Sequence, residues 1–114
     1  MMIYLAHPYN GKRENFDDAS QMATGIHAAT KHAVFNPLDE FAHYGIAYSE
    51  REILDFCKGA LETCDCAMFS RGWEKSKGCR YEHFIATVRG IQIIYLDDID
   101  ETVFREFAKG GWAA

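Results

Sequence analysis

The fold follows from residues 66–90, which read C-A-M-F-S-R-G-W-E-K-S-K-G-C-R-Y-E-H-F-I-A-T-V-R-G. The first four residues form a short apolar run, which is typical of a strand covered on both faces of a sheet. A charged turn follows, and Ser76 and Gly90 are residue types that begin and end helices. The stretch therefore predicts a strand, a turn and a helix. The side chains predicted to face inward from this helix are Tyr81, Phe84, Ile85 and Val88.

The rest of the chain repeats this alternation. Three further apolar runs predict strands at Met2–Ala6, Ala33–Asn36 and Ile91–Leu96. Helical spacing and capping residues predict a helix from the N-cap Asn15 to about His32, a second from the capping-box pair Ser49 and Glu52 to about Thr63, and a final one that carries Val103, Phe104 and Phe107. Residues 38–48 have no clear period, so we expect a loop with one helical turn there.

Strands that are separated by helices of ten or more residues run parallel, with right-handed crossovers. We therefore expect a single α/β domain over residues 1–114, a three-layer, doubly wound fold of the flavodoxin or Rossmann type. Its four-stranded parallel sheet is predicted to have the order 2-1-3-4. In such a sheet a crevice opens between the first and third strands, at their carboxyl ends. Chemistry is expected in the two segments that border this crevice, residues 6–14 and 70–82.

Composition limits the class of protein. With 114 residues, of which 48% are hydrophobic and 25% charged, the chain resembles one ordinary globular domain. A net charge of −5 argues against duplex nucleic acid as the main partner. No run approaches the roughly 20 apolar residues of a membrane span, so no membrane partner is expected. The N-terminus lacks a basic region followed by an apolar stretch, which predicts a cytoplasmic protein.

The cysteines and histidines predict no metal site. None of the spacings in the cysteine set is that of a zinc ligand pair, and the five histidines show no ligand spacing either. We expect buried free thiols at Cys57, Cys64, Cys66 and Cys79, and no cofactor.

Several residues in the two crevice segments could bind or react with a ligand. If Ser76 caps its helix, the amides of residues 77–79 lack helical partners and, with the Ser76 hydroxyl, form an anion pocket that Gly78 leaves open. The alternative is that Ser76 is only an N-cap. Glu82, predicted to be half-buried, is either a solvated flank residue or a poised nucleophile or base. Tyr4 either bonds such a carboxylate or belongs to the core.

Two other side chains are candidates by position. His7 lies at the end of a central strand, where a ligand would bind. Trp73 lies in a loop with no evident core to join, so its indole either stacks on a flat base or packs over a neighbouring helix.

Two segments, Y-L-A-H-P-Y-N-G-K-R from Tyr4 and C-D-C-A-M-F-S-R-G-W-E-K-S-K-G-C-R-Y-E-H-F-I-A-T-V-R-G-I from Cys64, resemble the nucleoside 2-deoxyribosyltransferase superfamily. The resemblance covers most of the chain up to about Leu96 and includes the branch of 2'-deoxynucleoside 5'-monophosphate N-glycosidases. In that superfamily the first strand carries a tyrosine ahead of a glycine-containing substrate loop. The helix after the third strand carries a G-x-x-Y-E pattern, which Gly78, Tyr81 and Glu82 fit.

The resemblance implies that Glu82 is the catalytic nucleophile and that Tyr4 orients it. It also implies a phosphorylated substrate, because the monophosphate branch has a serine at the position of Ser76 where the transferases tend to have aspartate. Cys57 falls at the position of a family aspartate that contacts the sugar or base, and Asp55 is two residues away. Position in the crevice segments and the resemblance together give the expected substrate-binding residues, which are His7, Pro8, Tyr9, Asn10, Asp55, Trp73, Ser76 and Gly78.

The expected function is therefore cleavage of the N-glycosidic bond of 2'-deoxynucleoside 5'-monophosphates through a covalent glutamyl-deoxyribosyl intermediate. The alternative is a non-catalytic module that binds or senses a nucleotide. A homodimer is also expected, because Phe104, Phe107 and Trp112 supply more aromatic surface than one short helix needs, and a neighbouring subunit helps to complete the site in the resembling family. Otherwise these aromatics complete the core of a monomer.

Overall fold

The chain forms an α/β fold around one parallel sheet, seen in a computed structural model that describes residues 1–41 and 49–110. The elements are β1 (Met2–Ala6), α1 (Arg13–Thr30), β2 (Ala33–Phe35), α2 (Pro37–Phe41), α3 (Glu50–Glu62), β3 (Cys66–Phe69), the 3₁₀ turn η1 (Trp73–Lys75), α4 (Lys77–Arg89), β4 (Gln92–Tyr95) and α5 (Asp98–Ala108). The strand order is β2-β1-β3-β4 and every pair is parallel, which confirms the predicted fold class and topology.

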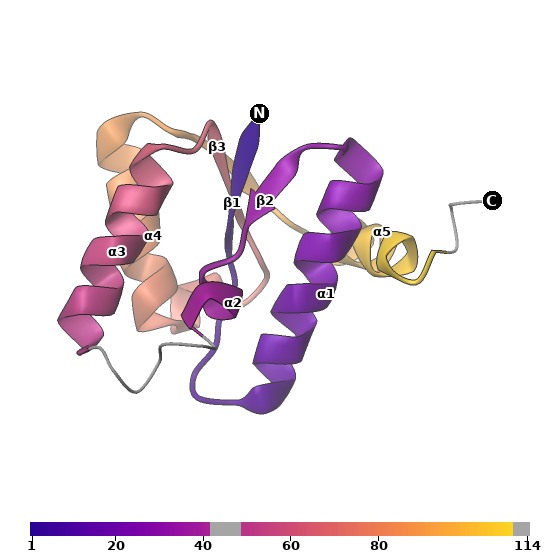
Figure 1. Cartoon of the computed structure of the whole chain (residues 1–114), viewed down its shortest axis with the longest axis horizontal. Coiled ribbons are helices and arrows are strands. Elements are labelled where there is room, and N and C mark those ends of the chain that lie inside the picture. Colours follow the sequence, from indigo (N-terminus) through magenta and orange to yellow (C-terminus); the bar gives the residue numbers. More distant parts are fainter. Residues whose placement is uncertain (42–48, 111–114) are drawn as a thin grey trace.

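Helices cover both faces of the sheet, which therefore has three layers. Figure 1 shows α3 and α4 together on one side of the strands and α1 and α5 on the other. The strand side chains alternate accordingly: Tyr4 and Ala6 belong to a core with residues of α3 and α4, whereas Ile3 and Leu5 pack with residues of α1. Tyr4 and Ala6 of β1 therefore point toward α3 and α4.

Local sequence signals placed most element ends correctly. Ser49 and Glu52 form the predicted capping box, and Gly90 ends α4 in the left-handed conformation with φ 69°. The predicted cap Asn15 is wrong, because α1 begins at Arg13 and the Asn15 side chain instead donates to the carbonyl of Tyr9, at 2.8 Å. The cysteines at 57, 64, 66 and 79 are buried free thiols, as expected.

The predicted inward face of α4 is partly wrong. Phe84 and Val88 are exposed, at 61% and 63% of their surface. The face that packs on the sheet carries instead Cys79, Glu82, Ile85 and Ala86. The hydrophobic pattern predicted the wrong rotation of α4 about its own axis, because one of the inward positions holds a carboxylate, that of Glu82. α4 therefore presents an ionisable group to the interior.

None of the helices in the described ranges is both long and apolar enough to cross a membrane.

Gly25 allows α5 to lie against α1, and its substitution is expected to destabilise the fold. A Cβ atom at Gly25 would lie 1.8 Å from the backbone oxygen of Phe104. Relief requires one helix to shift, so Gly25→Ala is expected to cost about 2 kcal/mol of unfolding free energy. Gly59 is the matched control, because its Cβ would meet nothing within 4 Å in the exposed part of α3.

Gly59→Ala is expected to stabilise the protein by up to about 1 kcal/mol, through higher helix propensity. Urea denaturation of both variants measures the two effects. Equal effects of the two substitutions would contradict a close approach at Gly25.

Candidate functional site

A buried pair of side chains, Tyr4 and Glu82, lies where β1 meets α4. Tyr4 sits in the middle of the sheet, with Phe35 and Ala67 as its neighbours in register. Its hydroxyl donates a hydrogen bond to Oε2 of Glu82. The predicted partnership between Tyr4 and a carboxylate is therefore confirmed. Glu82 is only 6% exposed, so the expectation that it is half-buried is wrong.

Burial changes the acidity of both groups. It raises the pKa of Glu82 from 4.5 to about 7, although the hydrogen bonds from Tyr4 and Cys79 act in the opposite direction. Burial, and then the charge of Glu82, raise the pKa of Tyr4 well above its usual value. Tyr4 therefore stays protonated as a donor, while Glu82 is divided between its acid and carboxylate forms near neutral pH.

Glu82 borders a cavity of about 220 Å³. Three parts of the fold line this cavity: the loop after β1, an apolar wall from α2 and α3, and the first turns of α4. The lining residues are His7, Tyr9, Asn10, Pro37, Leu38, Ile53, Leu54, Cys57, Ser76, Lys77, Gly78, Cys79 and Glu82. The cavity lies at the carboxyl ends of β1 and β3, where the winding of the sheet reverses.

The amino end of α4 supplies the polar side of this cavity. The buried Ser76 is the N-cap, and its hydroxyl accepts a hydrogen bond from the amide of Cys79, at 3.3 Å. This contact uses one of the amides expected to be free. Helix geometry leaves the amides of Lys77 and Gly78 without helical acceptors, and a Cβ at Gly78 would meet nothing within 4 Å. An anion can therefore approach the backbone here.

Cys57 and Cys79 also line the cavity. The resemblance had placed Cys57 at the position of a family aspartate, whereas Cys79 was expected only as a buried thiol. Burial, and next the charge of Glu82, raise the pKa of each thiol to about 12. Both thiols are therefore neutral and inert as nucleophiles. Cys79 lies three residues before Glu82 on α4, so helical spacing alone could have placed it beside the carboxylate.

Six of the ten predicted site residues line this cavity, and Tyr4 reaches it only through its hydrogen bond to Glu82. The other three lie elsewhere. The Trp73 ring stacks on His83, with ring centroids 4.3 Å apart, and borders another cavity of about 620 Å³. The indole thus packs over a neighbouring helix, α4, which is one of the two alternatives that the sequence left open. Pro8 is buried beside Gly72.

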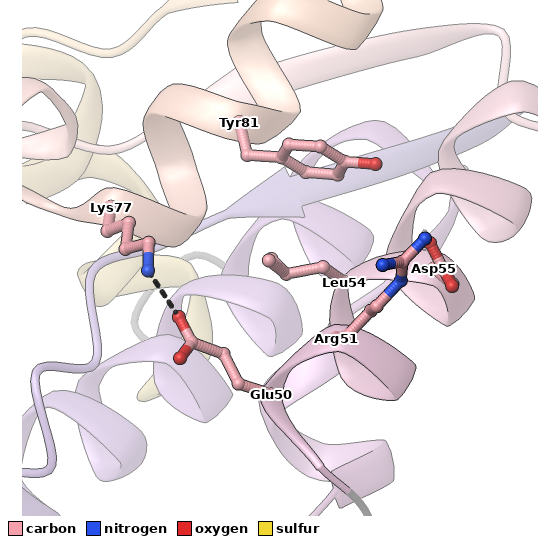
Figure 2. Close-up of a pocket in the computed structure, with 6 residues that line it drawn as sticks. All are labelled: Glu50, Arg51, Leu54, Asp55, Lys77 and Tyr81. Carbon is pink, nitrogen blue, oxygen red and sulfur yellow. Dashed lines mark ion pairs between the residues drawn. The ribbon is translucent and has the colours of Figure 1, made fainter.

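Asp55 lines a neighbouring cavity of about 410 Å³ between α3 and α4. Figure 2 shows this space, with Tyr81 on one side, Asp55 on the other, and Lys77 paired with Glu50 across it at 3.0 Å. Leu54 and Lys77 also line the Glu82 cavity, so the two spaces are adjacent. Asp55 therefore lies next to the Glu82 cavity rather than in it.

Residues 1–41 and 49–110 contain no group of three or more His, Cys, Asp or Glu side chains that could hold a metal ion. The chemistry that the described site can supply is that of a buried carboxylate, a tyrosine donor and backbone amides.

Comparison with known families gives a match over most of the chain. The family model of a domain of unknown function, DUF4406, matches residues 1–95. The match spans β1 through β4 and includes Tyr4, Ser76 and Glu82, whereas α5 lies beyond it. No curated protein matches the chain.

Proposed function

Since this chain belongs to the DUF4406 family, whose function is unknown, the activity must be argued from the site, and we propose that the protein cleaves the N-glycosidic bond of 2'-deoxynucleoside 5'-monophosphates. One observation carries the proposal: a buried carboxylate held by a tyrosine borders the same cavity as a serine-capped helix end. These groups match in type and order those of the nucleoside 2-deoxyribosyltransferase superfamily, which the sequence resembles.

In the first step, a carboxylate oxygen of Glu82 forms a bond to C1' of the sugar while the bond from C1' to the base nitrogen breaks. The electron pair of that bond leaves with the base, which takes a proton from water. Positive charge develops on the sugar ring in the transition state, and the carboxylate stabilises it. Tyr4 holds Oε2 of Glu82, so it fixes the direction from which the carboxylate attacks.

In the second step, water attacks C1', the ester bond to Glu82 breaks, and the proton released by this water neutralises the hydroxide left by the first step. The carboxylate is regenerated, and 2-deoxyribose 5-phosphate leaves with net retention of configuration. A second base in place of water would give deoxyribosyl transfer instead of hydrolysis. Neither route requires a cofactor.

The sugar preference follows from the chemistry of the transition state, and the phosphate preference follows from the amino end of α4. A 2'-deoxy sugar forms the cationic transition state more easily, because an electron-withdrawing 2'-hydroxyl is absent. The Ser76 hydroxyl and the amides of Lys77 and Gly78 would bind the 5'-phosphate, as helix amino ends bind anions in general. A nucleoside without the phosphate leaves these donors unpaired and should bind less well.

The size of the cavity supports a homodimer as part of the proposal. At about 220 Å³ it is smaller than typical ligand pockets, which begin at about 300 Å³. A second copy of the chain would enclose the remainder of a nucleotide. Of the aromatics behind the dimer expectation, Phe104 packs against the core of its own chain, Phe107 is partly buried, and Trp112 lies outside the described residues. We place the enzyme in the cytoplasm, where nucleotides are found.

The test is the release of free base, measured by chromatography. The protein is incubated with each of the four 2'-deoxynucleoside 5'-monophosphates, and the matched ribonucleotides and unphosphorylated deoxynucleosides serve as controls. We expect release from at least one deoxynucleotide, and slower release from both controls. Intact deoxynucleotides in every incubation would exclude the catalytic proposal.

The second candidate is a non-catalytic nucleotide-binding module, and one observation favours it. Cys57, a neutral thiol, occupies the position of an aspartate in the resembling superfamily. A rise in thermal stability on adding deoxynucleotide, without base release, would support this candidate.

A further inference from the structure

A chain of polar contacts links the two loops that border the crevice. It begins at His7, in the loop after β1, whose ring is almost fully buried. Nδ1 of His7 lies 2.8 Å from the carbonyl oxygen of Pro8, and Nε2 lies 2.8 Å from Oδ2 of Asp18 in α1. Each ring nitrogen thus has a hydrogen-bond partner, and together the two contacts fix the orientation of the ring.

The chain continues through α5. Arg105 donates two hydrogen bonds to Asp18, from Nε to Oδ1 and from a terminal nitrogen to Oδ2, each at 3.0 Å. It also donates to Oε1 of Glu101, at 3.3 Å. The other oxygen of the buried Glu101 accepts the backbone amide of Arg71, at 2.9 Å, in the loop after β3. One arginine thus lies between two carboxylates, and each carboxylate holds a different loop.

We infer that Asp18 and Arg105 are positioning residues that fix both crevice loops from the far side of the sheet, through His7 and the amide of Arg71. His7 lines the Glu82 cavity, so any effect of these contacts on catalysis rests on the proposed function. The loop after β3 ends at Ser76, the N-cap of α4. α5 thereby aligns both sides of the cavity without contacting a substrate.

The contacts differ from ordinary surface ion pairs. Side-chain exposure is 29% for Asp18 and 33% for Arg105, and the pair is doubly hydrogen-bonded, which gives it a defined geometry. Burial raises the pKa of Asp18, but the hydrogen bonds from Arg105 and His7 outweigh it and hold that pKa below its ordinary value. The adjacent pair of Arg13 and Asp17 is largely exposed and single, at 3.2 Å, so it contributes little.

The helix contact described above makes this network possible. Gly25 brings α1 and α5 close together, and Figure 1 shows the two helices on the same side of the sheet. The central pair of the network, Asp18 and Arg105, is 87 positions apart along the chain. They lie together only because α5 returns to pack on α1.

The experiment compares Arg105→Gln, Asp18→Asn and the control Asp17→Asn by amide hydrogen exchange and by NMR of the His7 ring nitrogens. Arg105→Gln should speed exchange about tenfold in both loops, residues 7–12 and 71–76, while amides in β1 and β3 keep their rates. Asp18→Asn should affect the first loop alone and shift the His7 ring signals. Asp17→Asn should change neither loop.

Base release gives a second readout. Arg105→Gln is expected to raise KM for the deoxynucleotide about tenfold with a smaller change in kcat, since the loops bind substrate rather than react. If the wild-type protein releases no base, the proposed function fails, but the exchange and NMR measurements still decide the positioning role.

Unchanged exchange in both loops of Arg105→Gln, or faster exchange spread evenly over all elements, overturns the inference. If Arg105→Gln does not fold, Asp18→Asn decides: an unaltered first loop and unaltered His7 signals then overturn it.

Discussion

Glu82→Gln is expected to lower base release from deoxynucleoside monophosphates by about a thousandfold or more, because an amide oxygen cannot form the glycosyl ester through which the reaction proceeds. Glutamine has nearly the same shape and can still accept the hydrogen bond from Tyr4, so the cavity should keep its form. The loss should therefore appear in kcat, with little change in nucleotide binding. Steady-state kinetics with chromatographic detection of the base measures it.

Glu106→Gln is the matched control. It removes the same charge from an exposed position on α5 and should leave base release unchanged. In the wild-type protein, kcat/KM should rise with pH through about 7, because only the carboxylate form of Glu82 is a nucleophile. Undiminished release by Glu82→Gln would exclude Glu82 as the nucleophile, whatever the pH dependence.

The sequence predicted the layers and strand order of the fold because their signals are local. Short apolar runs separated by helical periods permit few arrangements, and right-handed crossovers reduce them further. Ser49 with Glu52 and Gly90 act within one helical turn, so they could be recognised without knowledge of the fold. Asn15 shows the limit of this method: a residue suited to capping instead bonds the loop that precedes its helix.

The candidate site could be predicted where a single polar side chain stands in an otherwise apolar element. Tyr4 is the one polar side chain in a central strand, so its hydroxyl was expected to need a partner if buried, and Glu82 is that partner. The hydrophobic pattern misplaced Phe84, because it assumes that apolar residues define the inward face of a helix. The buried carboxylate of Glu82 on that face breaks the assumption.

Long-range pairing left no signal in the sequence. Nothing near Asp18 or Arg105 indicates that they meet, since that contact depends on how α5 packs against α1. Trp73 was ambiguous for a related reason. An indole in a loop can face a ligand or a helix, and only the position of His83 showed which side it packs on.

Glu82→Gln is also expected to change how stability depends on pH. The folded protein holds the proton of Glu82 up to about pH 7, whereas the unfolded chain releases it near 4.5. Between these values the folded state binds more protons, so stability falls as pH rises. A difference of roughly 2.5 in pKa corresponds to about 3 kcal/mol at pH values above both. Relative to the wild-type protein, Glu82→Gln should therefore gain about 3 kcal/mol of unfolding free energy between pH 4 and pH 8.

Urea denaturation of both proteins at several pH values measures this gain, and comparing differences between pH values cancels any effect of the glutamine that does not depend on pH. Glu106→Gln, at an exposed position, should follow the wild-type curve. Parallel curves for wild type and Glu82→Gln would mean that Glu82 titrates normally in the folded protein. A gain at pH 8 would instead show that the fold tolerates a buried carboxylate at a cost in stability, which is the expected signature of a group retained for its chemistry rather than for packing.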